Sequence, residues 1–406
     1  MYRVAITGVG IISCLGTDRQ TVARALRKGK SGIVIDEERI NLGFRSPLTG
    51  KIKNFFPHQS LSRKQQKTMP DFVVQTYSAV MEALTQSGLS PRDWQNGESG
   101  LIFGCDSSCQ AAIEQVRILR EEGETKAIGS GLIFRSMTST VTMNLNTLLK
   151  TRGISLTISS ACSSGGHAVG LGADLIALGR QERVICGGAQ EINWESMCSF
   201  DGLGAFSIRT DRPETASRPF DADRDGLIPS GGAAALVLEQ YDLAKKRGAR
   251  ILGEVVSYAF SSDGNHISIP SPEGLGSAMG KALNQSGLKA TEIDYICAHA
   301  TSTPVGDSVE AESILHVFGE PTPWVSSLKS MTGHELWMSG ASQVVYSVIM
   351  AQEEFLAPNL NFEHPDPNSG RLKIVRETVP QRPQLVLCNS AGFGGTNSCL
   401  VLRFER

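Results

Sequence analysis

Residues 157–166 read TISSACSSGG and place one cysteine, Cys162, in a turn of small residues. The apolar run before it, residues 154–158, predicts a strand, and residues 167–178 after it predict a helix. A thiol at such a corner faces the positive end of a helix dipole, which favours the nucleophilic thiolate. The glycines and serines leave room for a substrate carbonyl and expose N–H groups that can hold an oxyanion. A buried structural cysteine is the alternative.

Length and charge limit the classes of protein that this chain can represent. The chain has 406 residues and a formal net charge of −2. Single hydrophobic cores stop growing at about 250–300 residues, so we expect two core regions or one large layered α/β body. The chain has no block of like charges, which argues against a nucleic-acid partner. It also has no apolar run of about 18 residues, so we expect no membrane association.

The termini and cysteines indicate the compartment. Residues 1–6 enter a strand pattern directly, so we expect no signal peptide. The nine cysteines are odd in number and scattered, which favours free thiols in a reducing cytoplasm. Cys105 and Cys109 are four residues apart, but no second pair has matching spacing. We therefore expect packing or pocket-lining roles for these two and no metal site.

Three glycines near the N-terminus invite a nucleotide-binding interpretation, which their spacing opposes. Gly16 follows Gly10 by six residues rather than three, and no acidic residue ends a second strand about 20 residues later. We expect that Gly8, Gly10 and Gly16 form a structural turn after the first strand.

Strand-like and helix-like runs alternate through the chain and predict an α/β fold. The predicted strands are residues 4–6, 100–103, 154–158, 184–187, 233–238, 255–259, 295–298, 324–326, 385–389 and 399–402. The predicted helices are residues 21–28, 73–87, 141–149, 169–178, 277–286, 309–318 and 343–353. Glycines at 88, 179, 248 and 287 are typical helix stops.

A weak internal repeat divides the chain. Gly88-Leu89 follows one predicted helix just as Gly287-Leu288 follows another, although chance recurrence explains so short a pattern equally well. If the repeat is real, the join lies near residues 242–250. We expect an N-terminal half of residues 1–245, which carries Cys162, and a C-terminal half of residues 246–406.

Two histidines lie at strand ends inside loops of Gly, Ser and Thr. His299 ends an apolar run and is followed by ATSTPVGD, in which Asp307 or Ser308 is expected to cap the next helix. His334 lies in SLKSMTGHE, residues 327–335, after a short predicted strand. Functional residues concentrate in such loops of α/β proteins. A structural role is the alternative for each histidine, and the other five histidines lack this setting.

These motifs together resemble the β-ketoacyl synthases, specifically the elongating carrier-protein type with a Cys-His-His triad. The resemblance rests on SAC at 160–162, HATSTPVGD at 299–307, KSMTGH at 329–334 and GFGGTN at 392–397, in the family's order and spacing. It covers the whole chain. It implies a thiolase-like fold, which is a duplicated αβαβα five-layer sandwich. It also implies an acyl carrier protein as partner and a homodimer, with a heterodimer with a related ketosynthase-like chain as the alternative.

The resemblance also implies the chemistry. Cys162 takes an acyl group from a thioester, and the N–H groups of Cys162 and Phe393 form the oxyanion hole. His299 and His334 stabilise the enolate that forms when malonyl-acyl-carrier-protein loses CO2. The carbanion then attacks the acyl group to give a β-ketoacyl product. The expected enzyme is an acyltransferase of fatty acid or related polyketide synthesis, without metal or redox cofactor.

Supporting residues follow from the same motifs. Lys329 and Glu310 match a pair that sets the local field and orients the histidines, with a plain surface ion pair as the alternative. Thr301 and Thr303 match positions that hydrogen-bond a phosphopantetheine arm, and Asn397 is expected to stabilise its loop beside them. Phe393 matches a gating aromatic. Basic positions expected to dock the carrier protein are Lys64, Lys67 and Lys126, each of which can equally be a solvated lysine.

The chain also departs from the family pattern. Ala391 stands where elongating synthases commonly carry a second Phe, and Trp337 stands where small residues are usual. Ala300 replaces the usual Gly, and residues 104–109 are unusual. We therefore hypothesise a remodelled acyl pocket or gate and a specialised pathway, such as aryl polyene synthesis. Two other functions remain as alternatives: a non-catalytic partner akin to chain-length factors, and a bare decarboxylase.

Overall fold

Two groups of five strands form the centre of the molecule, and the computed structural model describes them within residues 1–405. The strands of the first group are β1 (Val4–Ile12), β4 (Ser99–Gly104), β5 (Ser155–Ile158), β6 (Arg183–Gln190) and β7 (Gly232–Gln240). Those of the second are β8 (Gly253–Ser262), β9 (Tyr295–Cys297), β10 (Trp324–Ser326), β12 (Leu385–Gly392) and β13 (Thr396–Arg403). The groups join where Val4–Ile6 of β1 pairs antiparallel with β8.

The two groups repeat one topology. The first runs β5-β4-β6-β7-β1 and the second β10-β9-β12-β13-β8, with β11 (Lys373–Ile374) added at the outer edge. If the five strands of each group are numbered 1 to 5 in chain order, both groups have the spatial order 3-2-4-5-1. The duplicated α/β architecture is therefore present. The predicted boundary at residues 245 and 246 falls inside α11 (Tyr241–Lys246) and stays a prediction, and residue 406 of the predicted C-terminal half lies outside the described residues.

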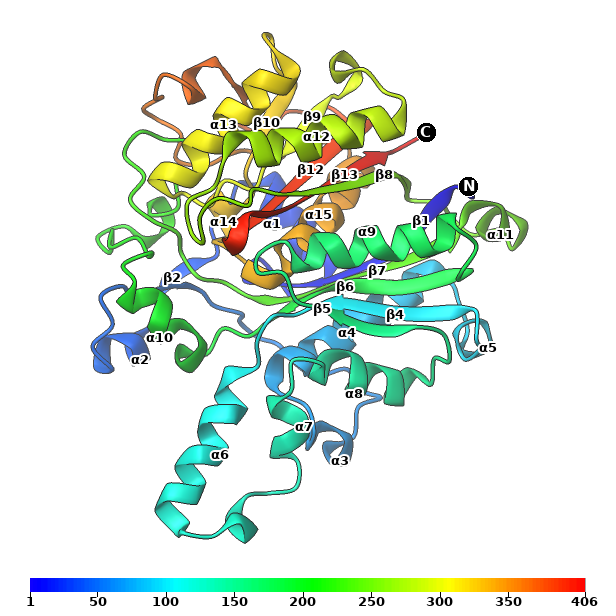
Figure 1. Ribbon diagram of the computed structural model, residues 1–406, viewed down its shortest axis with the longest axis vertical. Coiled ribbons are helices and arrows are strands. Elements are labelled where there is room, and N and C mark those ends of the chain that lie inside the picture. Colours follow the sequence, from blue (N-terminus) through cyan, green and yellow to red (C-terminus); the bar gives the residue numbers. More distant parts are fainter. Residues whose placement is uncertain (406) are drawn as a thin grey trace.

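Helices and strands stack in five layers (Figure 1). Two helices, α9 (Ser164–Ala177) and α15 (Ser339–Glu353), lie between the two groups of strands. The outer face of the first group is covered by α4 (Asp71–Ser87) and α8 (Thr140–Leu149), and that of the second by α12 (Pro272–Ser286) and α13 (Pro304–Phe318). The middle position explains α15, in which nearly every residue is buried, because a helix enclosed on all sides must be apolar or small all round.

Glycines in β1 serve close packing rather than a turn, which corrects the sequence prediction for Gly8 and Gly10. The strand continues through both residues to Ile12. A Cβ at Gly8 would lie 2.0 Å from the carbonyl oxygen of Ala83, and one at Gly10 would lie 1.9 Å from that of Ala79. Both carbonyls belong to α4. The absence of side chains therefore lets α4 pack directly on the backbone of β1.

The elements that the sequence did not predict are short or lie away from the two cores. They are β2 (Ile33–Ile35), β3 (Leu48–Gly50), β11, α2 (Glu37–Asn41), α3 (Arg63–Gln66), α5 (Pro91–Trp94), α6 (Cys109–Glu122), α7 (Leu132–Ser136), α10 (Trp194–Gly202), α11 and α14 (Lys329–Thr332). The first helix, α1 (Arg19–Arg27), begins two residues earlier than expected. Within residues 1–405, no helix has both the length and the apolar character needed to cross a membrane.

Candidate active site

Cys162 lies in the tight connection between β5 and α9, as the sequence predicts. The helix begins at Ser164, three residues earlier than expected, so the thiol lies directly at its N-terminus. Ala161 has a φ of +48°, which is strained for a residue with a Cβ. The Ser164 hydroxyl accepts the N–H of Ser160 at 2.8 Å and donates to the carbonyl of Ala161 at 2.7 Å. These bonds hold the turn in the conformation that presents the sulfur.

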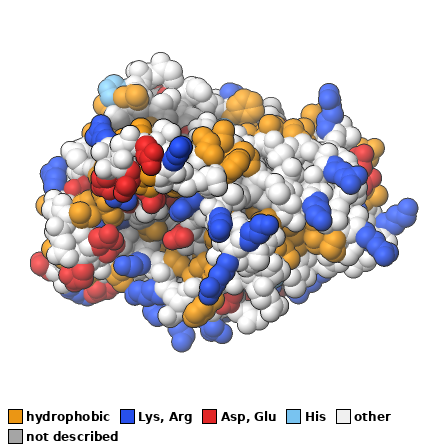
Figure 2. Space-filling view, turned by 90° about the horizontal axis from the view of Figure 1, so that it is seen from below, with side chains coloured by type: hydrophobic (Ala, Val, Ile, Leu, Met, Phe, Trp, Pro, Cys, Tyr) orange, Lys and Arg blue, Asp and Glu red, His pale blue; other side chains and the backbone are white. Residues whose placement is uncertain are grey.

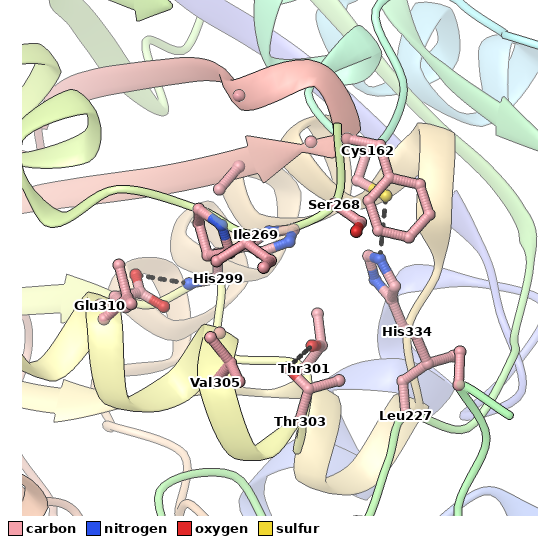
Figure 3. A pocket seen from close by; sticks show the side chains of 18 of the residues that line it. Cys162, Leu227, Ser268, Ile269, His299, Thr301, Thr303, Val305, Glu310 and His334 are labelled. Atoms are coloured by element: carbon pink, nitrogen blue, oxygen red, sulfur yellow. Dashed lines mark hydrogen bonds between the residues drawn. The ribbon is translucent and has the colours of Figure 1, made fainter. Parts of the chain in front are cut away.

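His334 approaches the sulfur directly. Its Nε2 lies 3.1 Å from the Cys162 Sγ, and Figure 3 shows the ring pointing at the thiol. Gly333, with a φ of +70°, turns the chain from α14 toward the site. The backbone of His334 is fixed on both sides, because its N–H donates to Ile228 at 2.7 Å and its carbonyl accepts from Ser230 at 2.9 Å.

His299 follows the end of β9 and lies beside His334. The two ring centroids are 5.2 Å apart and the rings are nearly perpendicular, at 89°. The Nδ1 of His299 is buried and has no hydrogen-bond partner among the described residues. The structure thus brings Cys162, His299 and His334 together at one cavity (Figure 3).

Glu310 and Lys329 flank the histidines, but neither is on the surface and they form no direct ion pair. Their exposed fractions are 3% and 4%. The Glu310 carboxylate accepts the backbone N–H groups of His299 at 2.9 Å and Ala300 at 2.6 Å, and the side-chain amide of Asn389 at 3.0 Å. The Lys329 Nζ is buried without a hydrogen-bond partner among the described residues. Glu310 therefore positions the His299 backbone, and Lys329 acts through its charge.

Burial sets the protonation states. The pKa values of His299 and His334 lie well below the usual range because both rings are buried and the Lys329 ammonium is near. Both rings are therefore neutral at pH 7. Burial also raises the pKa of the Cys162 thiol to about 12, against the opposing effect of Lys329. Burial therefore opposes the resting thiolate that the sequence predicts, whereas the Lys329 charge favours it.

An apolar cavity of about 380 Å³ leads to the thiol. It is lined by Cys162, both histidines, Thr301, Thr303, Phe393 and Asn397, together with apolar side chains such as Leu227 and Phe200. The hydroxyls of Thr301 and Thr303 lie 3.1 Å apart and face the same space (Figure 3). The amide nitrogen of Asn397 donates to Ser261, Asp263 and the Gly395 carbonyl, so this side chain holds its loop, as expected.

The loop that carries Phe393 passes close to the cysteine. A Cβ on Gly392 would lie 3.0 Å from the backbone nitrogen of Cys162, so a glycine permits this approach. Phe393 is 40% exposed, and its ring stacks on Phe200 with centroids 6.0 Å apart. The loop is therefore placed where its N–H groups and its ring can act on a group bound to the sulfur.

The basic residues expected to dock a carrier protein lie elsewhere. Lys64 and Lys67 are exposed at α3, and Lys126 is exposed in the turn after α6. A Cβ on Gly131 would lie 2.4 Å from the carbonyl oxygen of Lys67, so α3 and the segment before α7 pack together. Figure 2 views this lower end and shows Lys and Arg side chains among hydrophobic ones. None of the three lysines lines the cavity.

Two residues near the site, Asp307 and Glu335, have roles that the sequence did not predict. Asp307 does not cap the helix. Thr303 holds the N-cap position, while the Asp307 carboxylate accepts the N–H groups of Thr301 and Thr303 and shapes the loop. Glu335 is 2% exposed and accepts hydrogen bonds from Ser342 and Tyr346 directly behind His334. The sequence signal for Glu335 was a charged residue directly after His334 in an otherwise apolar stretch.

Within residues 1–405, one group of three acidic and histidine side chains lies close enough together to bind a metal ion, and it is not at this cavity. It consists of Asp221, Asp223 and His364. Asp221 pairs with Arg218, and Asp223 bonds the His364 ring at 2.7 Å. These partners give the group a structural explanation.

Comparisons with known proteins identify the family to which this chain is similar. The family model for the N-terminal domain of β-ketoacyl synthases matches residues 1–244, and that for the C-terminal domain matches residues 252–363. The chain is 39% identical over 406 residues to 3-oxoacyl-[acyl-carrier-protein] synthase 1 of Haemophilus influenzae, covering 99% of each. A crystal structure of a β-ketoacyl synthase from Burkholderia phymatum covers 100% of both chains with a TM-score of 0.95 and 33% identity. A ketosynthase solved with its type II polyketide acyl-carrier protein also covers 100% of both, with a TM-score of 0.91 and 26% identity.

Proposed function

This chain belongs to the β-ketoacyl synthase family and has its thiolase-like fold, and on that premise we propose how its own residues carry out the condensation. The enzyme is an acyltransferase that joins an acyl thioester to malonyl-acyl-carrier-protein in fatty acid or related synthesis. The observation that carries the assignment of residues is the Cys162 sulfur 3.1 Å from His334, with His299 beside it at one cavity.

The first step is exchange of a thioester. The Cys162 sulfur attacks the acyl carbonyl as its proton passes to the neutral His334 Nε2, which lies within hydrogen-bond reach. The N–H groups of Cys162 and Phe393 stabilise the oxyanion. The carrier thiol leaves with a proton, and the acyl group remains on Cys162.

The second step forms the new carbon–carbon bond. Malonyl-carrier loses CO2, and negative charge develops on its thioester oxygen. Each neutral imidazole carries one N–H that can be donated to that oxygen; in His334 the hydrogen must then lie on Nε2, the opposite tautomer to the one that accepts the thiol proton in the first step. The carbanion attacks the Cys162 thioester, the β-ketoacyl-carrier product leaves, and one proton from solvent restores the thiol. Thiol and imidazole groups supply all of this chemistry, so we propose that no metal or redox cofactor takes part.

Thr301 and Thr303 are proposed to bind the pantetheine arm, supported by their two hydroxyls in the cavity wall. Phe393 is proposed as the gate. Lys64, Lys67 and Lys126 are proposed to attract an acidic carrier protein, supported by their exposure at one end of the molecule. The nine free cysteines support a reducing compartment, the cytoplasm.

We also propose a homodimer, in preference to a heterodimer with a related chain. Apolar side chains of α6 and α7 and of the residue after α7 are exposed to between 40% and 53%: Ile113, Val116, Leu119, Ile133, Phe134 and Met137. The strand β5 pairs only with β4 among the described strands, and its Leu156 is also exposed. Apolar patches and open strand edges of this kind are typical of interfaces. A second copy offers the same features for a symmetric contact.

The assignment is tested by measuring CO2 release and chain extension separately. We expect Cys162→Ala to abolish chain extension while CO2 release from malonyl-carrier persists. His299→Ala and His334→Ala are expected to slow CO2 release by about 100- to 1000-fold, since each removes one oxyanion donor. His316→Ala, an exposed residue of α13, is the matched control.

Two outcomes contradict the assignment. A wild-type protein that releases no CO2 with any carrier substrate is a non-catalytic partner. One that releases CO2 and never extends a chain is a bare decarboxylase.

A further inference from the structure

The space around the Cys162 thiol is divided into an open side and a filled side. The cavity occupies the open side, where His299, His334 and the hydroxyls of Thr301 and Thr303 lie. The filled side is formed by three side chains of the apolar cluster to which Cys162 belongs, namely Met197, Phe206 and Trp337. None of these three side chains lines the cavity.

The proposed reaction requires two groups near the sulfur at once. During condensation the arm of the malonyl-carrier must reach the two histidines, so it takes the open side. An acyl tail already bound to Cys162 must then extend into the filled side. The size of the acyl group that fits there is set by the side chains that occupy that space.

Trp337 is the largest of these side chains and is held in place. Its exposed fraction is 7%, its indole Nε1 donates to the Ser107 hydroxyl at 3.3 Å, and its backbone N–H donates to Gln190 at 3.2 Å. The ring also packs against Phe200, with centroids 6.4 Å apart.

The backbone under Trp337 has little freedom to withdraw. It belongs to the short turn Leu336–Met338, and Leu336 has a φ of +43°, a strained value for leucine. A Cβ on Gly165 of α9 would lie 3.0 Å from the Trp337 carbonyl oxygen, and one on Gly188 of β6 would lie 2.6 Å from the Met338 Cα. The turn is therefore wedged between α9 and β6, and the indole can leave its position only by turning its own side chain.

We propose that Trp337 limits the length of the acyl group held on Cys162, so that the enzyme accepts short acyl groups and discriminates against long ones. The inference rests on the proposed function. It adds a specificity-determining residue, which acts by occupying the space where an acyl tail would lie.

The test measures the rate at which Cys162 becomes acylated by carrier-bound acetyl, butyryl, octanoyl and dodecanoyl groups, followed as the mass increase of the intact protein. We expect the wild type to accept acetyl and butyryl at least about tenfold faster than the two long groups, because poor fit of even one methylene changes rates by about 10- to 200-fold. Trp337→Ala is expected to reduce this ratio to about threefold or less.

Three variants keep the test decisive. Trp337→Leu retains more packing and should broaden the acyl range even if Trp337→Ala does not fold. Trp337→Phe retains a large ring and should keep the preference for short groups. Trp324→Ala removes a half-buried tryptophan of β10 that packs on Lys373, outside the cavity, and should leave the preference unchanged.

The outcomes separate the two proposals. A wild type that accepts dodecanoyl as fast as acetyl overturns the role of Trp337 and leaves the proposed function intact. Persistent discrimination in both Trp337→Ala and Trp337→Leu also overturns it. No acyl adduct on the wild type with any of the four substrates contradicts the proposed function itself.

Discussion

A buried ammonium group beside two histidines sets the electrostatics of this site. Lys329 has no hydrogen-bond partner among the described residues, and its burial lowers its pKa. Its charge in turn lowers the pKa of both imidazoles and opposes the rise in the Cys162 pKa. Lys329 thus adds to the effect of burial, which is the main cause of the low pKa of both histidines, while it favours ionisation of the thiol.

Glu335 gives the site a pH dependence that can be measured as stability. Burial raises its pKa to about 7 from an ordinary value of 4.5. The folded state therefore favours the protonated form, so the free energy of unfolding falls as the pH rises from 4.5 to about 7. The pKa shift corresponds to a fall of about 3 kcal/mol in the free energy of unfolding. Glu335→Gln has no titrating carboxyl group at this position and should not show that fall.

Denaturant unfolding of the wild type and Glu335→Gln at pH 5 and pH 8 measures this difference. Glu377→Gln, an exposed control, should follow the wild type. If the free energy of unfolding changed equally with pH in the wild type and in Glu335→Gln, Glu335 would not be a carboxylic acid with a raised pKa.

The residues that gather around the Cys162 thiol were predictable from the sequence, whereas the effect of burial on their pKa values was not. Small residues around Cys162 and the loops that hold His299 and His334 indicate strand ends, and parallel strand ends meet at one edge of a sheet. Burial depends on segments far away in the chain, such as the 228–230 backbone that fixes His334. The sequence therefore predicted a thiolate without showing the burial that opposes it.

At the scale of elements, close contact between the two middle helices depends on glycine. A Cβ on Gly340 of α15 would lie 2.4 Å from the backbone nitrogen of Gly166 in α9. Backbone atoms cannot turn away, so we expect Gly340→Ala to lower the free energy of unfolding by about 1–3 kcal/mol. Because α9 begins at the cysteine turn, acylation of Cys162 should slow as well.

Gly280 provides the matched control for this substitution. It is also a helical glycine, but no atom would lie within 4 Å of its Cβ. Gly280→Ala should raise stability by about 0.5–1 kcal/mol, since alanine favours the helix. Thermal and denaturant unfolding compare the two, and equal effects would contradict the packing argument.

Long elements with a clear hydrophobic period were predicted, and elements outside the cores were missed. The helix α4 was predicted nearly to the residue because one face packs on β1 and β7 and Gly88 ends it in a left-handed conformation. By contrast, α6 buries only Ala111, so its apolar residues do not mark a core-facing side. Because of its glycines, two-thirds of β1 was not predicted: glycines indicate turns unless a helix is known to pack on them.

At the scale of the whole molecule, the exposed apolar surface of α6 and α7 predicts the oligomeric state. The two helices extend from the lower end of the body (Figure 1). We expect the double variant Ile113→Asp/Phe134→Asp to sediment as a monomer, because a charge on each helix opposes burial at an interface. Leu178→Asp, with 64% exposure after α9, should sediment like the wild type.

Analytical ultracentrifugation distinguishes the outcomes. A double variant that keeps the wild-type mass would place the dimer contact elsewhere. A wild type that is monomeric alone and dimeric only with a related chain would favour the heterodimer.

The division of the site between the two halves has a consequence for synthesis of the protein. Cys162 is translated well before His299 and His334. The strand β1 can pair with its neighbours only after β7 and β8 have been translated, and both follow residue 230. Such distant partners make folding slow. A ribosome-bound fragment that ends before residue 334 lacks the imidazole that lies 3.1 Å from the Cys162 sulfur in the complete fold, so on the proposed function we expect Cys162 to become acylated only after both halves have been made.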